Sequence, residues 1–304
     1  MNNPISQAEG ARLLKLATNA SIAVALLLIA AKGMAYWQTS SMSILASLVD
    51  SLMDSGASLF NLIAVRYALV PADRQHRFGH GKAESIAALA QSTLIIGSGL
   101  YLVVEAGRRL MNPEPLTAFG MGVAVMVFTV VVTIGLVALQ SYVIRRTGSA
   151  AIRADSLHYR TDVLTNSGVI VALILAQFGW PGMDPLFAIA TAIYILYSAR
   201  AIMRDAFNEL LDRELPEEQR ALIQKIAEDH PDVKGVHDLR TRSSGRVEFI
   251  ELHLELDGNM SLLRSHSISD EVEDAIIKKI PAADVVIHQD PAGIDEVQQD
   301  EQLE

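Results

Sequence analysis

Residues 42–68 read MSILASLVDSLMDSGASLFNLIAVRYA, a membrane-helix pattern that contains two carboxylates, Asp50 and Asp54. A second pair, His158 and Asp162, opens another long apolar stretch. Both pairs are spaced i, i+4, which places the two side chains on one face of a helix. Ionisable groups at membrane depth are costly and usually functional. Two such helices can provide four nitrogen and oxygen ligands for one metal ion within the bilayer.

Apolar residues make up 50% of the 304-residue chain and are concentrated in its first two thirds. Each apolar segment approaches the roughly 20 residues needed to cross a hydrocarbon core. We expect Lys32, near the far end of the first segment, to extend to the membrane interface. That segment lacks a strongly basic start and an A-x-A site, which indicates a retained span rather than a signal peptide. The six predicted spans are 14–37, 42–69, 85–104, 116–144, 163–183 and 185–199.

Charge divides the chain near residue 211. The part up to Leu211 has a net charge of +3, and the part from Asp212 onward has a net charge of −13. Such an acidic tail argues against a nucleic-acid partner. The chain has no cysteine, so a transition-metal site must use histidine and carboxylate, which suit zinc, manganese and ferrous iron.

Lysine and arginine concentrate in alternate connections, which predicts cytoplasmic N- and C-termini. The opposite connections carry few charges, with Arg108 and Arg109 as the exceptions. The basic residues on the predicted cytoplasmic side are Arg12, Lys15, Arg66, Arg74, Arg77, Lys82, Arg145, Arg146, Arg153, Arg200 and Arg204.

Short periodic segments replace the long apolar runs after residue 211. We therefore predict a six-helix transmembrane domain over 1–211, a cytoplasmic domain over 212–291 and a disordered acidic tail over 292–304. The order αββαβ is that of a small two-layer α+β domain. Its predicted helices are 216–230 and 261–280, and its predicted strands are 236–242, 246–257 and 284–288.

Two further groups of residues are candidate metal sites outside the spans. Asp73, His76 and His80 form a D-x-x-H-x-x-x-H array in a loop, for which the alternative is a solvated polar loop beside lipid headgroups. In the tail, scattered surface histidines are the alternative to a metal site. The tail candidates are His237, His253, His266, His288 and Asp290.

The four residues within the spans indicate carriage of an ion. Four protein ligands complete a tetrahedral zinc shell, whereas a catalytic zinc usually keeps one position for water. Imidazole binds metal only when neutral and carboxylate only when ionised, so metal and protons exclude one another. A metal–proton exchanger is the hypothesis that follows. The alternative is two helices with incidental polar residues, each satisfied separately.

The chain resembles the cation diffusion facilitator family, specifically its bacterial zinc and ferrous-iron efflux branch. The likeness extends from about Leu13 to Pro291. Its carriers are SILASLVDSLMDSGASL, PADRQHRFGHGKAES, RADSLHYRTDVLTNSG, HDLRTR and VIHQDP.

The resemblance implies an inner-membrane homodimer that exchanges cytoplasmic zinc for external protons, with a ferredoxin-like, metallochaperone-like cytoplasmic domain. It implies a transport site of Asp50, Asp54, His158 and Asp162, and a loop site of Asp73, His76 and His80. It also implies a binuclear, dimer-stabilising zinc site in the tail. One zinc would bind His237, His266 and Asp290, and the other His253, His288 and Asp290.

Lys82 and Asp212 match a charge interlock at the membrane surface, although each could equally be a solvated charge. With three aspartates and one histidine, the transport site should accept cadmium as well as zinc, and iron or manganese are further candidates.

Two other classes of protein compete with a transporter. An intramembrane prenyltransferase would use aspartates to hold magnesium diphosphate, but magnesium prefers octahedral oxygen shells, and the tail histidines would be unexplained. A metal sensor would use the tail and need the membrane half only as an anchor, for which six spans with charged pairs are excessive. Metal-dependent flux distinguishes the transporter from the sensor, and turnover of a prenyl diphosphate would identify the enzyme.

Overall fold

The computed structural model describes residues 6–111, 120–178 and 183–293. They form two compact units. One comprises residues up to Pro71 together with Lys82–Phe207, and the other comprises Ala72–Gly81 together with the chain from Asn208 onward. The loop before Lys82 is therefore part of the second unit. The predicted acidic tail lies outside the described residues from 294 onward.

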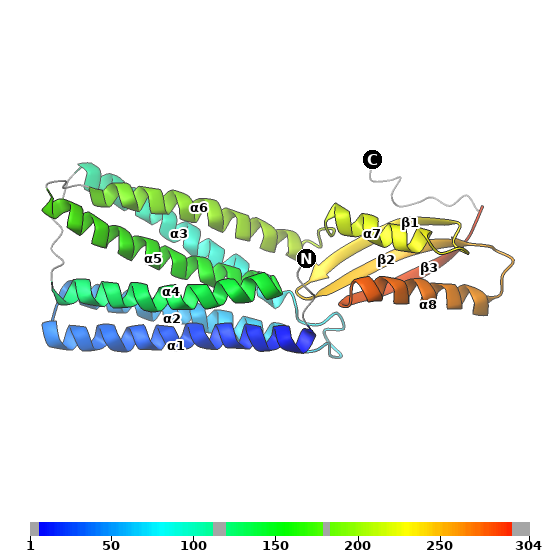
Figure 1. The fold of residues 1–304 in the computed structure, drawn as a ribbon, viewed down its shortest axis with the longest axis horizontal. Coiled ribbons are helices and arrows are strands. Elements are labelled where there is room, and N and C mark those ends of the chain that lie inside the picture. Colours follow the sequence, from blue (N-terminus) through cyan, green and yellow to red (C-terminus); the bar gives the residue numbers. More distant parts are fainter. Residues whose placement is uncertain (1–5, 112–119, 179–182, 294–304) are drawn as a thin grey trace. The chain divides into compact units, whose positions relative to one another are not determined.

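Six long helices make up the first unit (Figure 1). Helix α2 lies within its predicted span, and each of the others extends past the predicted apolar span at one or both ends, because charged and polar residues continue the helix beyond the hydrocarbon-length segment. The greatest difference is in α5, which begins 13 positions before the predicted span 163–183 and thus holds His158 and Asp162 in its interior. The helices are α1 (Gln7–Thr39), α2 (Met42–Ala68), α3 (Ala83–Met111), α4 (Met121–Thr147), α5 (Ala150–Gln177) and α6 (Met183–Leu210).

Five of these helices, all but α5, are long and apolar enough to cross a membrane. The first half of α5 carries Arg153, Asp155, Arg160 and Asp162, which lower its hydropathy. This helix also lies at the centre of the packing. Leu157 belongs to a core cluster shared with α3 and α6, and Ile152 belongs to a cluster shared with α1 to α4. Its polar groups are therefore held by protein rather than by lipid.

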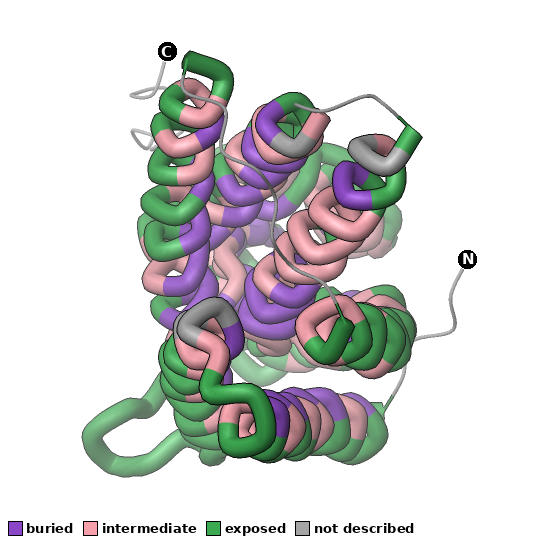
Figure 2. The backbone as a smooth tube through the Cα atoms, turned by 90° about the vertical axis from the view of Figure 1, so that its left-hand side faces the viewer, coloured by how far each residue is buried: buried purple, intermediate pink, exposed green. Residues whose placement is uncertain are grey.

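Burial follows one side of each long helix (Figure 2). Buried residues face the neighbouring helices, while large apolar side chains such as Leu26, Phe60, Leu94 and Tyr197 are exposed. An exposed apolar surface of this extent is expected where lipid covers the protein. The result confirms the predicted helical membrane domain.

The second unit contains a small α+β domain with the predicted order αββαβ. Strand β2 pairs antiparallel with β1 and parallel with β3 (Figure 1). Along β2, Ile250, Leu252 and Leu254 are buried in a core that α7 and α8 complete through Ile223 and Ile268. The elements are α7 (Glu217–Glu228), β1 (Gly235–Ser244), β2 (Val247–Leu256), α8 (Leu262–Lys279) and β3 (Ala283–Pro291).

The 72–81 loop packs on one end of this sheet. The ring of Phe78 meets that of Phe249 edge to face, with centroids 5.4 Å apart, and the Arg242 guanidinium lies within 5 Å of both rings. Gly81 approaches the Ser244 carbonyl so closely that a Cβ atom would clash with it. The loop is therefore a packed part of the α+β unit.

Candidate metal sites

The predicted membrane site forms between α2 and α5. Asp54 Oδ1 lies 3.0 Å from His158 Nε2, and Asp162 Oδ2 lies 3.9 Å from the same nitrogen. One ligand atom from each of these three residues lies within 4.8 Å of the others. The side chains are about one-fifth to one-quarter exposed, so the group is partly shielded but reachable. We call Asp54, His158 and Asp162 the membrane cluster.

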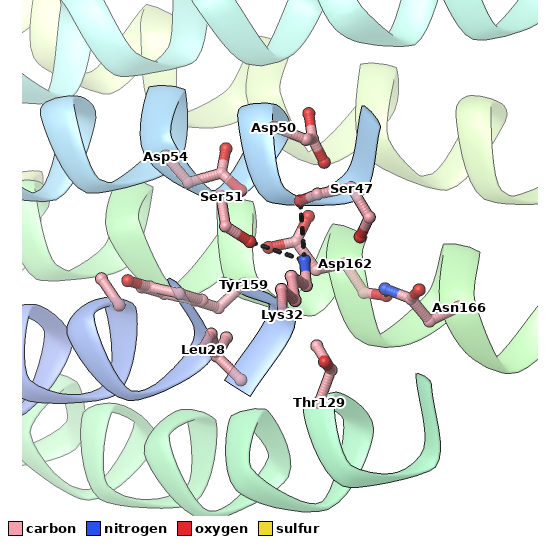
Figure 3. Close-up of a pocket in the computed structure, with 11 residues that line it drawn as sticks. Leu28, Lys32, Ser47, Asp50, Ser51, Asp54, Thr129, Tyr159, Asp162 and Asn166 are labelled. Atoms are coloured by element: carbon pink, nitrogen blue, oxygen red, sulfur yellow. Dashed lines mark hydrogen bonds between the residues drawn. The ribbon is translucent and has the colours of Figure 1, made fainter. Parts of the chain in front are cut away.

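Asp50, the fourth predicted ligand, lies outside this tight group. It is one turn before Asp54 on α2, and its carboxylate lines the same cavity (Figure 3). That cavity measures about 50 Å³, enough for water to enter. Asn166, whose amide donates to the Asp162 carbonyl at 2.7 Å, also lines it. Three of the four predicted ligands are thus assembled, with the fourth adjacent.

Lys32 is in a different place from the one the sequence predicted. It is 6% exposed and lines the cavity instead of extending to the interface. Its Nζ donates to Ser51 Oγ at 2.6 Å and to the Ser47 carbonyl at 3.1 Å (Figure 3). Helix α1 continues to Thr39, and α2 packs beside it, so hydrogen-bonding partners are available inside the bundle.

Asp155 is a second residue that the sequence reasoning missed. It is fully buried one turn before His158 and accepts hydrogen bonds from residues on four other helices. Because helix α5 also carries His158 and Asp162 of the membrane cluster, this network fixes the helix that presents these two ligands. The donors to the Asp155 carboxylate are Ser21 Oγ (2.7 Å), Gln140 Nε2 (2.8 Å), Gln91 Nε2 (3.3 Å) and Ser58 Oγ (3.4 Å). The sequence could have indicated this role, because an aspartate within a membrane helix needs hydrogen-bond partners.

The loop residues Asp73, His76 and His80 also come together. Asp73 lies 3.4 Å from His76 Nδ1 and 3.5 Å from His80 Nε2, and the two imidazole rings are 4.5 Å apart. Hydrogen bonds from the backbone N–H groups of His76 and Gln75 hold the pKa of Asp73 below its usual range. His80 is buried while the other two are exposed. We call these three residues the loop cluster.

Strand register brings three of the tail histidines side by side. His237 pairs with His253, and His253 pairs with His288, on the sheet face opposite the buried leucines of β2. All three contact the Asp290 carboxylate. The distances to it are 2.8 Å from His253 Nδ1, 3.1 Å from His288 Nε2 and 3.4 Å from His237 Nε2. We call His237, His253, His288 and Asp290 the sheet cluster.

His266 does not join the sheet cluster within one chain. It lies on α8, two-thirds exposed, with Asp270 at 3.6 Å. Two acidic residues that were not predicted as ligands lie closer to the sheet cluster than His266 does. Glu255 Oε1 is 3.4 Å from His237 Nδ1, and Asp238 offers a ligand atom beside His237 and His253. Strand pairing brings Glu255 to this position, and a sequence without the register does not reveal it.

Comparison with known proteins identifies the family. A model of the cation efflux transmembrane domain matches residues 19–211, and a model of the cation efflux protein cytoplasmic domain matches residues 215–292. The cation-efflux pump FieF of Klebsiella pneumoniae is 50% identical over 283 residues, which cover 93% of this chain and 94% of the relative. The chain belongs to the cation diffusion facilitator family.

The chain is also similar to a second FieF and to one solved domain. FieF of Escherichia coli K12 is also 50% identical over 283 residues, covering 93% of this chain and 94% of that one. The metal-bound C-terminal domain of the CzcD transporter from Thermotoga maritima is 31% identical, covering 26% of this chain and 93% of that one, with a TM-score of 0.25. This cation diffusion facilitator is therefore a multi-span cation efflux transporter, as its motifs predicted, and its family is one of transporters rather than enzymes.

Proposed function

We propose that this protein exports cytoplasmic zinc in exchange for protons by alternating access. The observation that carries the proposal is the membrane cluster, in which Asp54, His158 and Asp162 offer mixed nitrogen and oxygen ligands inside a bundle of membrane-spanning helices. Such ligands suit zinc, and the carboxylate-rich set extends the range to cadmium and ferrous iron. Asp50 completes the ligand set from the same cavity wall.

Proton coupling follows from the chemistry of these ligands. An imidazole and carboxylates release metal when they take up protons and release protons when metal binds. A site that opens alternately to the two sides of the membrane then exchanges one for the other. The direction of net zinc movement is set by the proton gradient across the inner membrane.

The remaining groups have supporting roles in this proposal. Residues 1–211 form the transport domain and residues 212–291 the cytoplasmic domain, through which two chains associate as a homodimer with both termini in the cytoplasm. The sheet cluster and His266 hold structural zinc that stabilises the dimer, and the loop cluster is a separate zinc site. Lys82 and Asp212 act as a charge interlock at the membrane surface.

Zinc flux in proteoliposomes under an imposed pH gradient tests the proposal. The native chain should take up zinc, and the rate should depend on the gradient. Asp162→Ala should abolish the flux, whereas Asp205→Ala, at an exposed ion pair with Arg153, should leave it unchanged. If the native chain carries no zinc while the cytoplasmic domain still binds it, the protein is a sensor and the proposal is wrong.

A further inference from the structure

Lys32 places a positive charge in the cavity that holds the metal ligands. Its two hydrogen-bond acceptors, Ser51 Oγ and the Ser47 carbonyl, are neutral, so they do not compensate the burial of an ammonium. The compensating charges are the carboxylates that line the same cavity (Figure 3). These are Asp50, Asp54 and Asp162.

The same carboxylates need a cation when no metal is present. Three acidic groups that share one small cavity repel one another, and the repulsion grows as the surroundings lose water. Lys32 comes from α1, whereas the carboxylates come from α2 and α5, so its charge is supplied by a third helix. It is covalently attached to the chain, so it cannot diffuse away when the metal leaves.

We propose that Lys32 is the resident cation of the metal-binding cavity. Its ammonium balances the carboxylates when the cavity holds no metal and repels the metal ion that enters, so that the ion is held loosely enough to be released. The inference rests on the proposed transport function and adds a residue that sets affinity and release. It assigns Lys32 no role as a ligand.

The ammonium of Lys32 also favours doubly charged metal ions over singly charged ones. A covalently attached ammonium has a high effective concentration at the site, so sodium or potassium must compete with it at equal charge. A divalent ion gains twice the attraction from the same carboxylates. Lys32 thereby excludes abundant monovalent ions while it admits metal.

The test is zinc flux in proteoliposomes, resolved into KM and maximal rate. Lys32→Met and Lys32→Gln remove the charge, and we expect KM for zinc to fall at least about tenfold and the maximal rate to fall with it, because metal leaves more slowly. Lys32→Arg keeps the charge and should stay within about threefold of the native KM. An unchanged or higher KM in both neutral variants would overturn the inference.

Ser51→Ala is the matched control for a purely structural tether. It removes the hydrogen bond at 2.6 Å between α1 and α2 but leaves the ammonium in the cavity. If Ser51→Ala lowers KM as much as Lys32→Met does, the change in KM comes from the lost hydrogen bond between α1 and α2 and not from the charge. The inference is then wrong. If the native chain carries no zinc at all, the transport proposal itself fails, which is a separate result.

A neutral variant that does not fold is also informative. Uncompensated repulsion among the carboxylates would then be the cause, and Lys32→Met combined with Asp50→Asn should restore a monodisperse protein with a measurable unfolding transition. Failure of the double variant to fold would show that Lys32 serves packing alone.

Discussion

Asp54 of α2 and His158 of α5 meet with Oδ1 3.0 Å from Nε2, which joins two helices through groups that can hold a metal. Asp162 lies one turn beyond His158, and its carboxylate faces the same nitrogen at 3.9 Å. Asp50 lies one turn before Asp54 at the cavity wall. Three of the four predicted ligands therefore lie close enough to share one metal ion, and Asp50 lies beside them.

This difference predicts unequal effects of ligand removal. Asp54→Asn should lower zinc transport at least about 100-fold, because it removes a carboxylate from the assembled cluster, and even partners outside the ligand shell are worth 10–100-fold. Asp50→Asn should cost less, about tenfold, because Asp50 lies outside the tight group. The measurement is initial zinc flux at equal protein density, with Ser55→Ala on the same helix as the control. Equal losses in the two variants would contradict the distinction.

The buried Asp155 network should matter for stability. Asp155→Ala leaves the donors of Ser21, Gln140, Gln91 and Ser58 without their acceptor, which costs about 3 kcal/mol or more. Asp155→Asn keeps one acceptor oxygen and should cost less. Thermal unfolding in detergent checks both. Asp205→Ala, at an exposed ion pair, should change stability by less than about 1 kcal/mol.

The sheet cluster predicts which tail residues bind zinc within one chain. Asp290→Asn should abolish zinc binding there, because all three clustered histidines contact that carboxylate. His266→Ala should weaken zinc binding less than Asp290→Asn does, since His266 lies apart from the other ligands on α8 within one chain. Zinc titrations of the full chain carrying Asp54→Asn and Asp73→Asn isolate this site. Equal loss in the Asp290 and His266 variants would contradict this ranking.

The loop cluster should keep a charged Asp73 ligand across the neutral pH range. Since backbone N–H groups lower the pKa of Asp73 in the folded loop, ionised Asp73 stabilises the loop fully above its unfolded value of about 3.9. That contribution is lost only as pH falls through the lower, folded pKa. Between pH 8 and 5 the Asp73 carboxylate therefore stays charged and available as a metal ligand.

Zinc binding to the loop, measured between pH 8 and 5 with Asp54→Asn and Asp290→Asn present, tests this. Adding Asp73→Asn should weaken zinc binding at every pH in this range, because the carboxylate that it removes is ionised throughout. If the substitution weakens binding at pH 8 but not at pH 5, Asp73 is itself protonated within the range and the prediction is wrong.

The sequence by itself determined the helical membrane half, the α+β order of the tail and the residue types of every candidate site. These are local or periodic properties: long apolar runs, alternation along strands, and i, i+4 spacing on a helix. The ends of the membrane helices, and above all the start of α5, were less well predicted. Hydropathy marks the segment of bilayer length and not the whole helix.

Only the tertiary structure decided which of these residues meet. It placed Lys32 inside the cavity with three carboxylates, gathered four helices around Asp155 and put three histidines side by side on adjacent strands. It also left His266 apart from them within one chain. The physical reason is that helix packing and strand register join residues far apart in sequence, and a buried charge adopts whichever partners that packing provides.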